Sequence, residues 1–122
     1  MEKKENVILK KSFEFACEVI DINKKLTEQK QFQIASQVIR SGTSIGANIR
    51  EAQRAVSKVD FVYKLGIALK EAEETSYWFE IIDKKIFKIE MSLRTQLEEI
   101  IKLLVSIINS SKKILLTETV NS

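Results

Sequence analysis

No proline occurs anywhere in the 122-residue sequence, and it contains only three glycines. Folds rich in strands need many turns, and turns draw heavily on glycine and proline. A chain without these residues, and rich in Lys, Glu, Ile and Leu, is typical of long helices. Its length fits a single domain, because domains usually contain about 100–200 residues. We therefore expect an all-α protein that forms one domain over residues 1–122.

Apolar residues recur at helical spacing in four segments, which predicts helices over residues 5–27, 32–56, 58–84 and 91–116. Ile8, Phe15 and Ile22 repeat every seven residues, as in a heptad seam. Ser57 is placed to cap the third helix, with Asp60 three positions later. Short connections predict an antiparallel, up-down-up-down four-helix bundle. The remaining seam residues are Ser12, Val19 and Leu26; Ile34, Val38, Ser41, Ile45, Asn48, Ala52 and Val56; Phe61, Leu65, Ala68, Ala72, Thr75, Phe79 and Ile82; and Leu93, Leu97, Ile100, Leu104, Ile107 and Ser111.

The second predicted helix is unusual because it carries Gly42 and Gly46 near its middle. Each costs about 1 kcal/mol relative to alanine inside a helix. Close approach of a neighbouring helix would compensate for that cost. The third segment has small residues, Ala68 and Ala72, at its centre, so we expect it to meet the glycines. We also expect Ile86 and Phe87 to cover one end of the bundle, and residues 117–122 to fray.

The first and fourth helices have more apolar surface than one bundle can bury. Phe13 and Ile20 form a second stripe on the first helix, and the middle of the fourth is apolar nearly all round. A helix in a lone bundle keeps a polar outer face. We therefore predict a homo-oligomer that buries the surplus between subunits. The candidate interface residues are Tyr77, Trp78, Ile101, Val105 and Ile108.

The composition argues against most enzyme classes. Without histidine the chain has no Ser-His-Asp or Cys-His catalysis and no His-ligated metal. Cys17, the single cysteine, is expected to be a buried structural thiol, and with no disulfide available a cytoplasmic location fits best. No segment approaches the roughly 20 apolar residues of a membrane span. We predict no enzyme activity, no cofactor and no metal; an all-carboxylate site within residues 71–80 is the enzymatic alternative.

Residues 37–54 carry a pattern that resembles the signature of the 23S rRNA intervening-sequence proteins. That signature consists of Arg-Ser, Ser-Ile, Asn-Ile, Glu and a nearby Arg; Ala52 departs from it, because many relatives have glycine there. The resemblance extends over about residues 9–115, and it implies a four-helix bundle and a ring-shaped homopentamer. A related bundle is the accessory protein of diversity-generating reverse transcriptases. The polar signature positions, which either form a hydrogen-bonded network between helices or subunits or bind a ligand, are Arg40, Ser41, Ser44, Asn48, Glu51 and Arg54.

Two functional hypotheses follow from the residues and the resemblance. The first is a non-enzymatic oligomeric scaffold that binds RNA or DNA, or a protein that acts on them. Assembly would multiply the formal charge of +3 per chain and strengthen attraction to phosphates. The second is a purely structural homo-oligomer whose partner is another polypeptide. The candidate nucleic-acid contacts are Arg40, Arg50, Arg54, Lys58 and Lys64.

Overall fold

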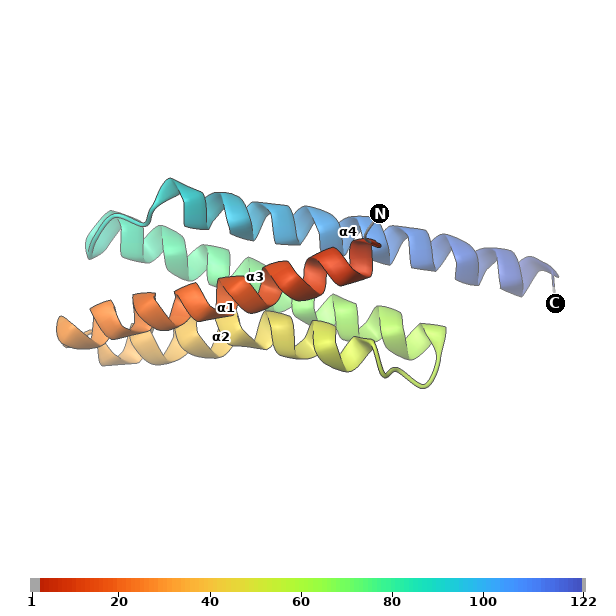
Figure 1. The fold of residues 1–122 in the computed structure, drawn as a ribbon, viewed down its shortest axis with the longest axis horizontal. Helices are drawn as coiled ribbons and strands as arrows, with labels where there is room; N and C mark the ends of the chain where they lie inside the picture. The colour runs from red at the N-terminus through yellow and green to blue at the C-terminus, as the bar shows by residue number, and fades with distance from the viewer. Residues whose placement is uncertain (1–2, 122) are drawn as a thin grey trace.

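The computed structural model describes the backbone of residues 3–121 and the side chains of residues 3–118. Within this range it consists of four helices: α1 (Lys4–Glu28), α2 (Phe32–Ala52), α3 (Lys58–Lys85) and α4 (Met91–Asn121). Successive helices run in opposite directions (Figure 1), and contacts join α1 to α2, α2 to α3, α3 to α4 and α4 to α1. The predicted all-α fold and antiparallel four-helix bundle are confirmed.

The core consists mainly of the predicted seams, with Ala35, Ile49, Ile89 and Ile108 added from outside them. All six seam residues of α4 are buried, as are the α3 residues from Leu65 to Ile82 on the predicted face. The Phe15 and Phe79 rings pack in the interior with their centroids 5.9 Å apart, which joins α1 to α3 across the bundle. Ile22 and Phe61, at less central positions, are only half-buried. Large aliphatic and aromatic residues at helical spacing therefore determine which face of α1, α3 and α4 points inward.

α2 ends four residues earlier than predicted. It stops at Ala52, and Val56 is 93% exposed rather than buried on the seam. The reason lies in the next helix, whose start is fixed by local hydrogen bonds. The Asp60 N–H donates to Ser57 Oγ at 3.0 Å, and the Val56 N–H donates to the Asp60 carboxylate at 3.3 Å. The predicted Ser57 cap is therefore confirmed. Its hydrogen bonds hold the residues before α3 in a turn, so α2 cannot continue to Val56.

The two other connections are equally compact. Lys30 adopts a left-handed backbone conformation (φ 60°) between α1 and α2. Between α3 and α4, Ile86 and Phe87 pack against the core, as predicted. The Ile89 N–H donates to Asp83 Oδ1 at 2.9 Å, which with the charges of Lys88 and Arg94 nearby lowers the pKa of Asp83.

The C-terminal end of the chain differs from the prediction of a frayed tail. α4 continues as a helix to Asn121, and it projects beyond the rest of the bundle in Figure 1. Ser122 lies outside the described residues. The turn of α4 just before this continuation carries the exposed apolar residues Ile114 and Leu116.

The glycines of α2 face α1, not α3, so that part of the prediction is wrong. A Cβ atom on Gly42 would lie 2.8 Å from both Cγ atoms of Val19, and one on Gly46 would lie 3.3 Å from the Ser12 carbonyl oxygen. The predicted pairing of α2 with α3 does exist, but it uses the neighbouring residue Ser41. One position along a helix is a rotation of about 100°, enough to turn Gly42 from one partner helix to the other.

Candidate functional site

The most connected polar group on the surface lies between α2 and α3. Arg40 Nη1 is 3.0 Å from Glu71 Oε2, and Arg40 Nη2 is bonded to Glu74 Oε2. The same Glu74 oxygen accepts a hydrogen bond from Trp78 Nε1 at 3.0 Å. On the side of α2, the Arg40 guanidinium also donates to Gln37 Oε1 at 3.4 Å. One arginine thus bridges two carboxylates, and one of those carboxylates fixes the orientation of the indole ring.

A buried pair of hydroxyls lies directly beneath this network. The Ser41 and Thr75 hydroxyls are hydrogen-bonded at 2.9 Å, and both residues are fully buried. Thr75 Oγ1 also lies 2.8 Å from the Glu71 carbonyl oxygen. Both hydroxyls are therefore satisfied, as buried polar groups must be. Together with the Arg40 cluster they specify how α2 and α3 are aligned.

The other signature residues do not join this network. Ser44 donates to the Arg40 carbonyl and Asn48 to the Ser44 carbonyl, both within α2. Glu51 lies 4.0 Å from Lys64. Among the described side-chain contacts, Arg54 makes no ion pair or hydrogen bond. The signature thus divides into Arg40 and Ser41, which face α3, and four residues that do not take part in this network.

The partners on α3 were not part of the predicted network. Glu71 and Glu74 appeared only as an acidic stretch, and Trp78 only as an interface candidate. Glu71, Glu74 and Trp78 are spaced by three, four and seven residues, so they share one face of α3. That spacing opposite an arginine on an antiparallel neighbour is the signal that identifies them. In the described part of the chain no three acidic or sulfur side chains gather as a metal site requires.

The predicted nucleic-acid contacts occupy separate places. Arg40 is engaged by two carboxylates, and Lys64 lies near Glu51. Arg50, Arg54 and Lys58, which we call the basic corner, lie where α2 ends and α3 begins. Arg50 lies 5.9 Å from the Phe13 ring centroid, and Lys58 lies 5.7 Å from the centroid of Phe61. None of these three cations has an ion pair with a carboxylate among the described side chains.

The candidate interface residues are also divided. Tyr77 is 57% exposed and Val105 is 40% exposed, whereas Trp78 and Ile101 are half-buried. Ile108 is buried in the core of its own bundle, so its assignment to a subunit interface is wrong. Its position one residue after the seam residue Ile107 turns it inward, between α4 and its neighbours.

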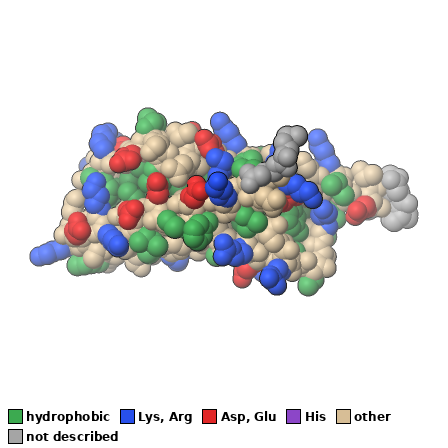
Figure 2. Space-filling view, in the orientation of Figure 1, with side chains coloured by type: hydrophobic (Ala, Val, Ile, Leu, Met, Phe, Trp, Pro, Cys, Tyr) green, Lys and Arg blue, Asp and Glu red, His purple; other side chains and the backbone are tan. Residues whose placement is uncertain are grey.

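Apolar side chains do remain on the outer surface of α1 and α4. Phe13 and Ile20 are exposed on α1, as Val105, Ile114 and Leu116 are on α4. On the face shown in Figure 2, hydrophobic side chains reach the surface between the charged ones. Cys17 is exposed rather than buried, because it points away from the seam formed by its neighbours at positions 15 and 19. The expected buried thiol is therefore wrong.

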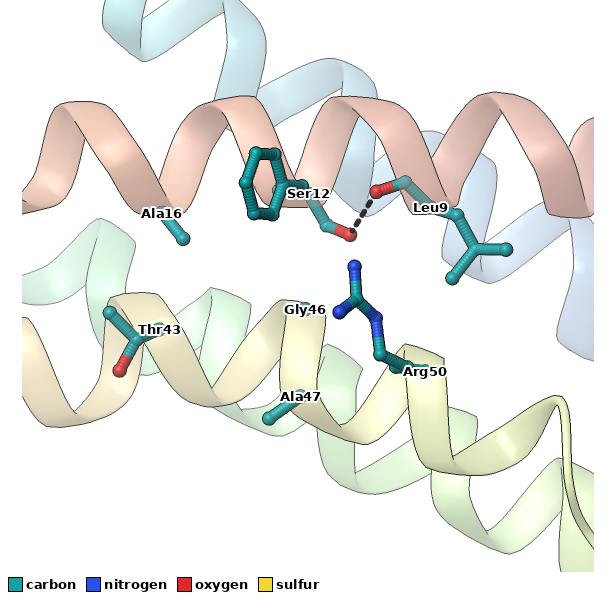
Figure 3. A pocket seen from close by; sticks show the side chains of 8 residues that line it. Leu9, Ser12, Ala16, Thr43, Gly46, Ala47 and Arg50 are labelled. Atoms are coloured by element: carbon teal, nitrogen blue, oxygen red, sulfur yellow. Dashed lines mark hydrogen bonds between the residues drawn. The ribbon is translucent and has the colours of Figure 1, made fainter.

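A hollow of about 260 Å³ opens between α1 and α2. Figure 3 shows Arg50 extending from α2 across its mouth toward Ser12 on α1, whose hydroxyl donates to the Leu9 carbonyl at 3.2 Å. Gly46 and Ala47 form the α2 wall, and the close approach of the two helices keeps the hollow shallow. The hollow was not predicted, because it depends on which helix the glycines face.

Comparison with known proteins establishes the family. The family described as 23S rRNA-intervening sequence protein matches residues 4–109, most of the chain. The chain belongs to this family. The resemblance noted in the sequence is thereby confirmed.

A solved structure supports the same assignment. A protein of unknown function from the S23 ribosomal protein family of Bacteroides thetaiotaomicron is 49% identical to the chain, with a TM-score of 0.83. The comparison covers 88% of this chain and 99% of that one. No curated protein matches. These findings indicate no enzyme family, and they leave the α4 residues after 109 beyond the family match.

The helices were also assessed for their ability to span a membrane. Over the described residues, no helix has the length and apolar content needed to cross a bilayer.

Proposed function

We propose that this chain is a non-enzymatic, homo-oligomeric scaffold of the cytoplasm that binds RNA or DNA. The observation that supports this most directly is the basic corner. Arg50, Arg54 and Lys58 are exposed cations, and none forms an ion pair with a carboxylate among the described side chains. Cations left unpaired in this way are available to phosphates, which dominate nucleic-acid affinity.

Assembly supports the same function. The exposed apolar residues of α1 and α4, such as Phe13 and Val105, provide surface for contact between copies. A pentamer is the assembly that we propose, and its five copies would repeat the +3 charge of each chain around one particle. Repeated weak contacts on one polymer raise the overall affinity well above that of one copy.

Binding of labelled RNA and DNA across a salt series tests this function. The triple substitution Arg50→Gln, Arg54→Gln and Lys58→Gln should weaken binding and flatten its salt dependence. Each lost phosphate contact lowers the slope of log K against log salt by about 0.7–0.9. The matched control replaces Lys102, Lys112 and Lys113 on α4 by glutamine, which removes the same charge elsewhere.

Light scattering and thermal unfolding of both variants show whether assembly and fold are intact. Binding that falls equally in the two variants would mean that net charge alone attracts the polymer. No binding by the unaltered chain at low salt would overturn the proposal. An oligomer without such binding supports the purely structural alternative.

A further inference from the structure

Two hollows lie next to each other on the surface where α2 begins and α3 ends. Their volumes are about 640 and 510 Å³, and Phe32, Gln33 and Ile34 line both. Trp78 lines the first hollow, and Lys30 and Lys85 line the second. We call this surface the α2–α3 groove. In Figure 1 it belongs to the end of the bundle opposite the α2–α3 connection, so it is remote from the basic corner.

One half of the groove is aromatic. Phe32 is 60% exposed, and the half-buried Trp78 faces the same hollow. The Tyr77 ring adjoins the indole, with the two centroids 5.3 Å apart. Exposed flat rings on a surface offer π-faces on which bases stack. Beside them lie Gln33 and Gln37, whose amides carry both hydrogen-bond donors and acceptors, the groups that base edges require.

The indole ring is held in place without a ligand. Glu74 accepts the Trp78 N–H and is itself bound to Arg40. The ring orientation is therefore fixed before anything binds, which reduces the entropy that binding must overcome. Arg40 is shared between Glu74 and Glu71, so it offsets part of their negative charge beside the ring.

The other half of the groove is basic. Ile81 and Lys85 follow Trp78 by three and seven residues, so the three side chains share one face of α3. Seven residues of helix place Trp78 and Lys85 about 10 Å apart along the helix axis. Lys30 reaches the same hollow from the α1–α2 connection. No Asp or Glu lines either hollow among the described residues. The groove thus places flat rings beside uncompensated cations.

We propose that the α2–α3 groove binds single-stranded polynucleotide, with an unpaired base stacked on Trp78 and Phe32 and phosphate at Lys30 and Lys85. This inference rests on the proposed function and adds the strandedness of the nucleic acid and the site of base contact. A duplex hides its base faces within the helical stack, whereas single strands expose them. The groove therefore discriminates by strandedness and not by charge alone.

The single tryptophan of the chain makes the proposal directly measurable. Labelled 12-nucleotide oligouridine and oligothymidine, with a 12-base-pair duplex for comparison, are titrated while anisotropy and tryptophan fluorescence are recorded together. Stacking on the indole should quench its fluorescence in proportion to the anisotropy change. The single strands should bind more tightly than the duplex.

Substitutions identify the surface. Trp78→Leu and Phe32→Leu should each weaken single-strand binding about tenfold, because stacking on one aromatic residue contributes roughly 1–3 kcal/mol per base. Tyr63→Leu is the matched control, since Tyr63 is an exposed aromatic residue of α3 outside the groove. Phe32 is largely exposed, so its variant keeps the test decisive if Trp78→Leu does not fold.

Each outcome is distinguishable from failure of the proposed function. Oligonucleotide binding with no quenching, and with the groove variants equal to Tyr63→Leu, would overturn this inference but leave the scaffold function in place. Weaker binding in the basic-corner variant, together with quenching in the unaltered chain and weaker single-strand binding in the groove variants, would support both. A fall in molar mass in Phe32→Leu would show that a second copy covers the groove, which contradicts the inference. No binding of any polymer at low salt removes both proposals.

Discussion

α2 and α4 lie opposite each other in the bundle and pack against the same two helices, α1 and α3, yet they do so by different means. α2 approaches α1 through Gly42 and Gly46, and it meets α3 through the Ser41 hydroxyl and the Arg40 ion pairs. α4 contributes only Ser111 among polar residues to the described core, and its other core residues are Ile and Leu. Both helices bury apolar residues, but α2 adds close backbone approach and a buried hydrogen bond, whereas the polar contacts of α4, such as the Lys11–Glu99 ion pair, lie at the surface.

The difference separates specificity from stability. Apolar burial is non-directional, so the α4 seam supplies free energy without fixing one alignment. Hydrogen bonds and close backbone contacts tolerate only one register, so α2 fixes the arrangement of α1 and α3. The outer surface follows the same division. α4 keeps apolar side chains outside and continues past the bundle, whereas α2 shows an arginine engaged by two carboxylates.

The largest expected effect tests how much the apolar seam of α4 contributes to stability. Leu104→Ala should lower the free energy of unfolding by about 2–5 kcal/mol, because it removes a fully buried side chain and leaves a cavity. Val105→Ala is the control at the next position, where the side chain is 40% exposed, and it should cost less than about 1 kcal/mol. Urea unfolding followed by circular dichroism measures both. Equal losses would mean that assembly buries Val105 as completely as the bundle buries Leu104.

The sequence predicted the α4 side almost completely and the α2 side only in part. Burying a large aliphatic side chain contributes about 1.5–3 kcal/mol, so the five Leu and Ile residues of the predicted α4 seam, at helical spacing, leave one orientation. Glycine and serine contribute little to that signal. Gly42 was therefore assigned to the wrong neighbour. The sequence pattern does not reveal a rotation of the helix by one residue position when the residues concerned have almost no side chain. Val56 was placed on the seam for a different reason, because α2 ends at Ala52, before the turn capped by Ser57.

The second prediction sharpens the α2 side and uses two glycines with opposite expectations. Gly42→Ala should lower the free energy of unfolding by about 1–2 kcal/mol, because overpacking against the stiff, buried Val19 outweighs the gain in helix propensity. Gly66→Ala should raise it by about 1 kcal/mol, since the added Cβ would have no atom within 4 Å beyond its chain neighbours and the local helix backbone. Urea unfolding of the two variants checks the signs. Stabilisation by both would show that α1 and α2 do not require close approach.

The residues of the candidate site on α2 were predicted from the sequence, but their partners on α3 were not. The signature identified Arg40 and Ser41, but their partners Glu71, Glu74 and Thr75 lie on another helix, and a residue's partner depends on the register of two helices. The groove was missed for the same reason. Phe32 and Trp78 are 46 positions apart in sequence, and only the packing of α2 on α3 brings them to one surface.

The smallest expected effect is the coupling free energy between the Ser41 and Thr75 hydroxyls. It tests whether hydrogen bonding helps to hold α2 against α3, which is the feature that distinguishes α2 from α4. Ser41→Ala and Thr75→Val should each cost about 1–2 kcal/mol, because each leaves the other hydroxyl buried without its partner. The double variant should cost less than the sum by about 0.5–1 kcal/mol, since the second substitution removes a group that is already unsatisfied. Thr43→Val is the control, because its hydroxyl donates to the Ile39 carbonyl within α2 and its effect should add to that of Thr75→Val. Urea unfolding of the three single variants, the Ser41/Thr75 double variant and the Thr43/Thr75 double variant measures the free energies for both double-mutant cycles. Strict additivity for Ser41 and Thr75 would mean that the two hydroxyls are not coupled, and the signature serine would then have no role in fixing the register.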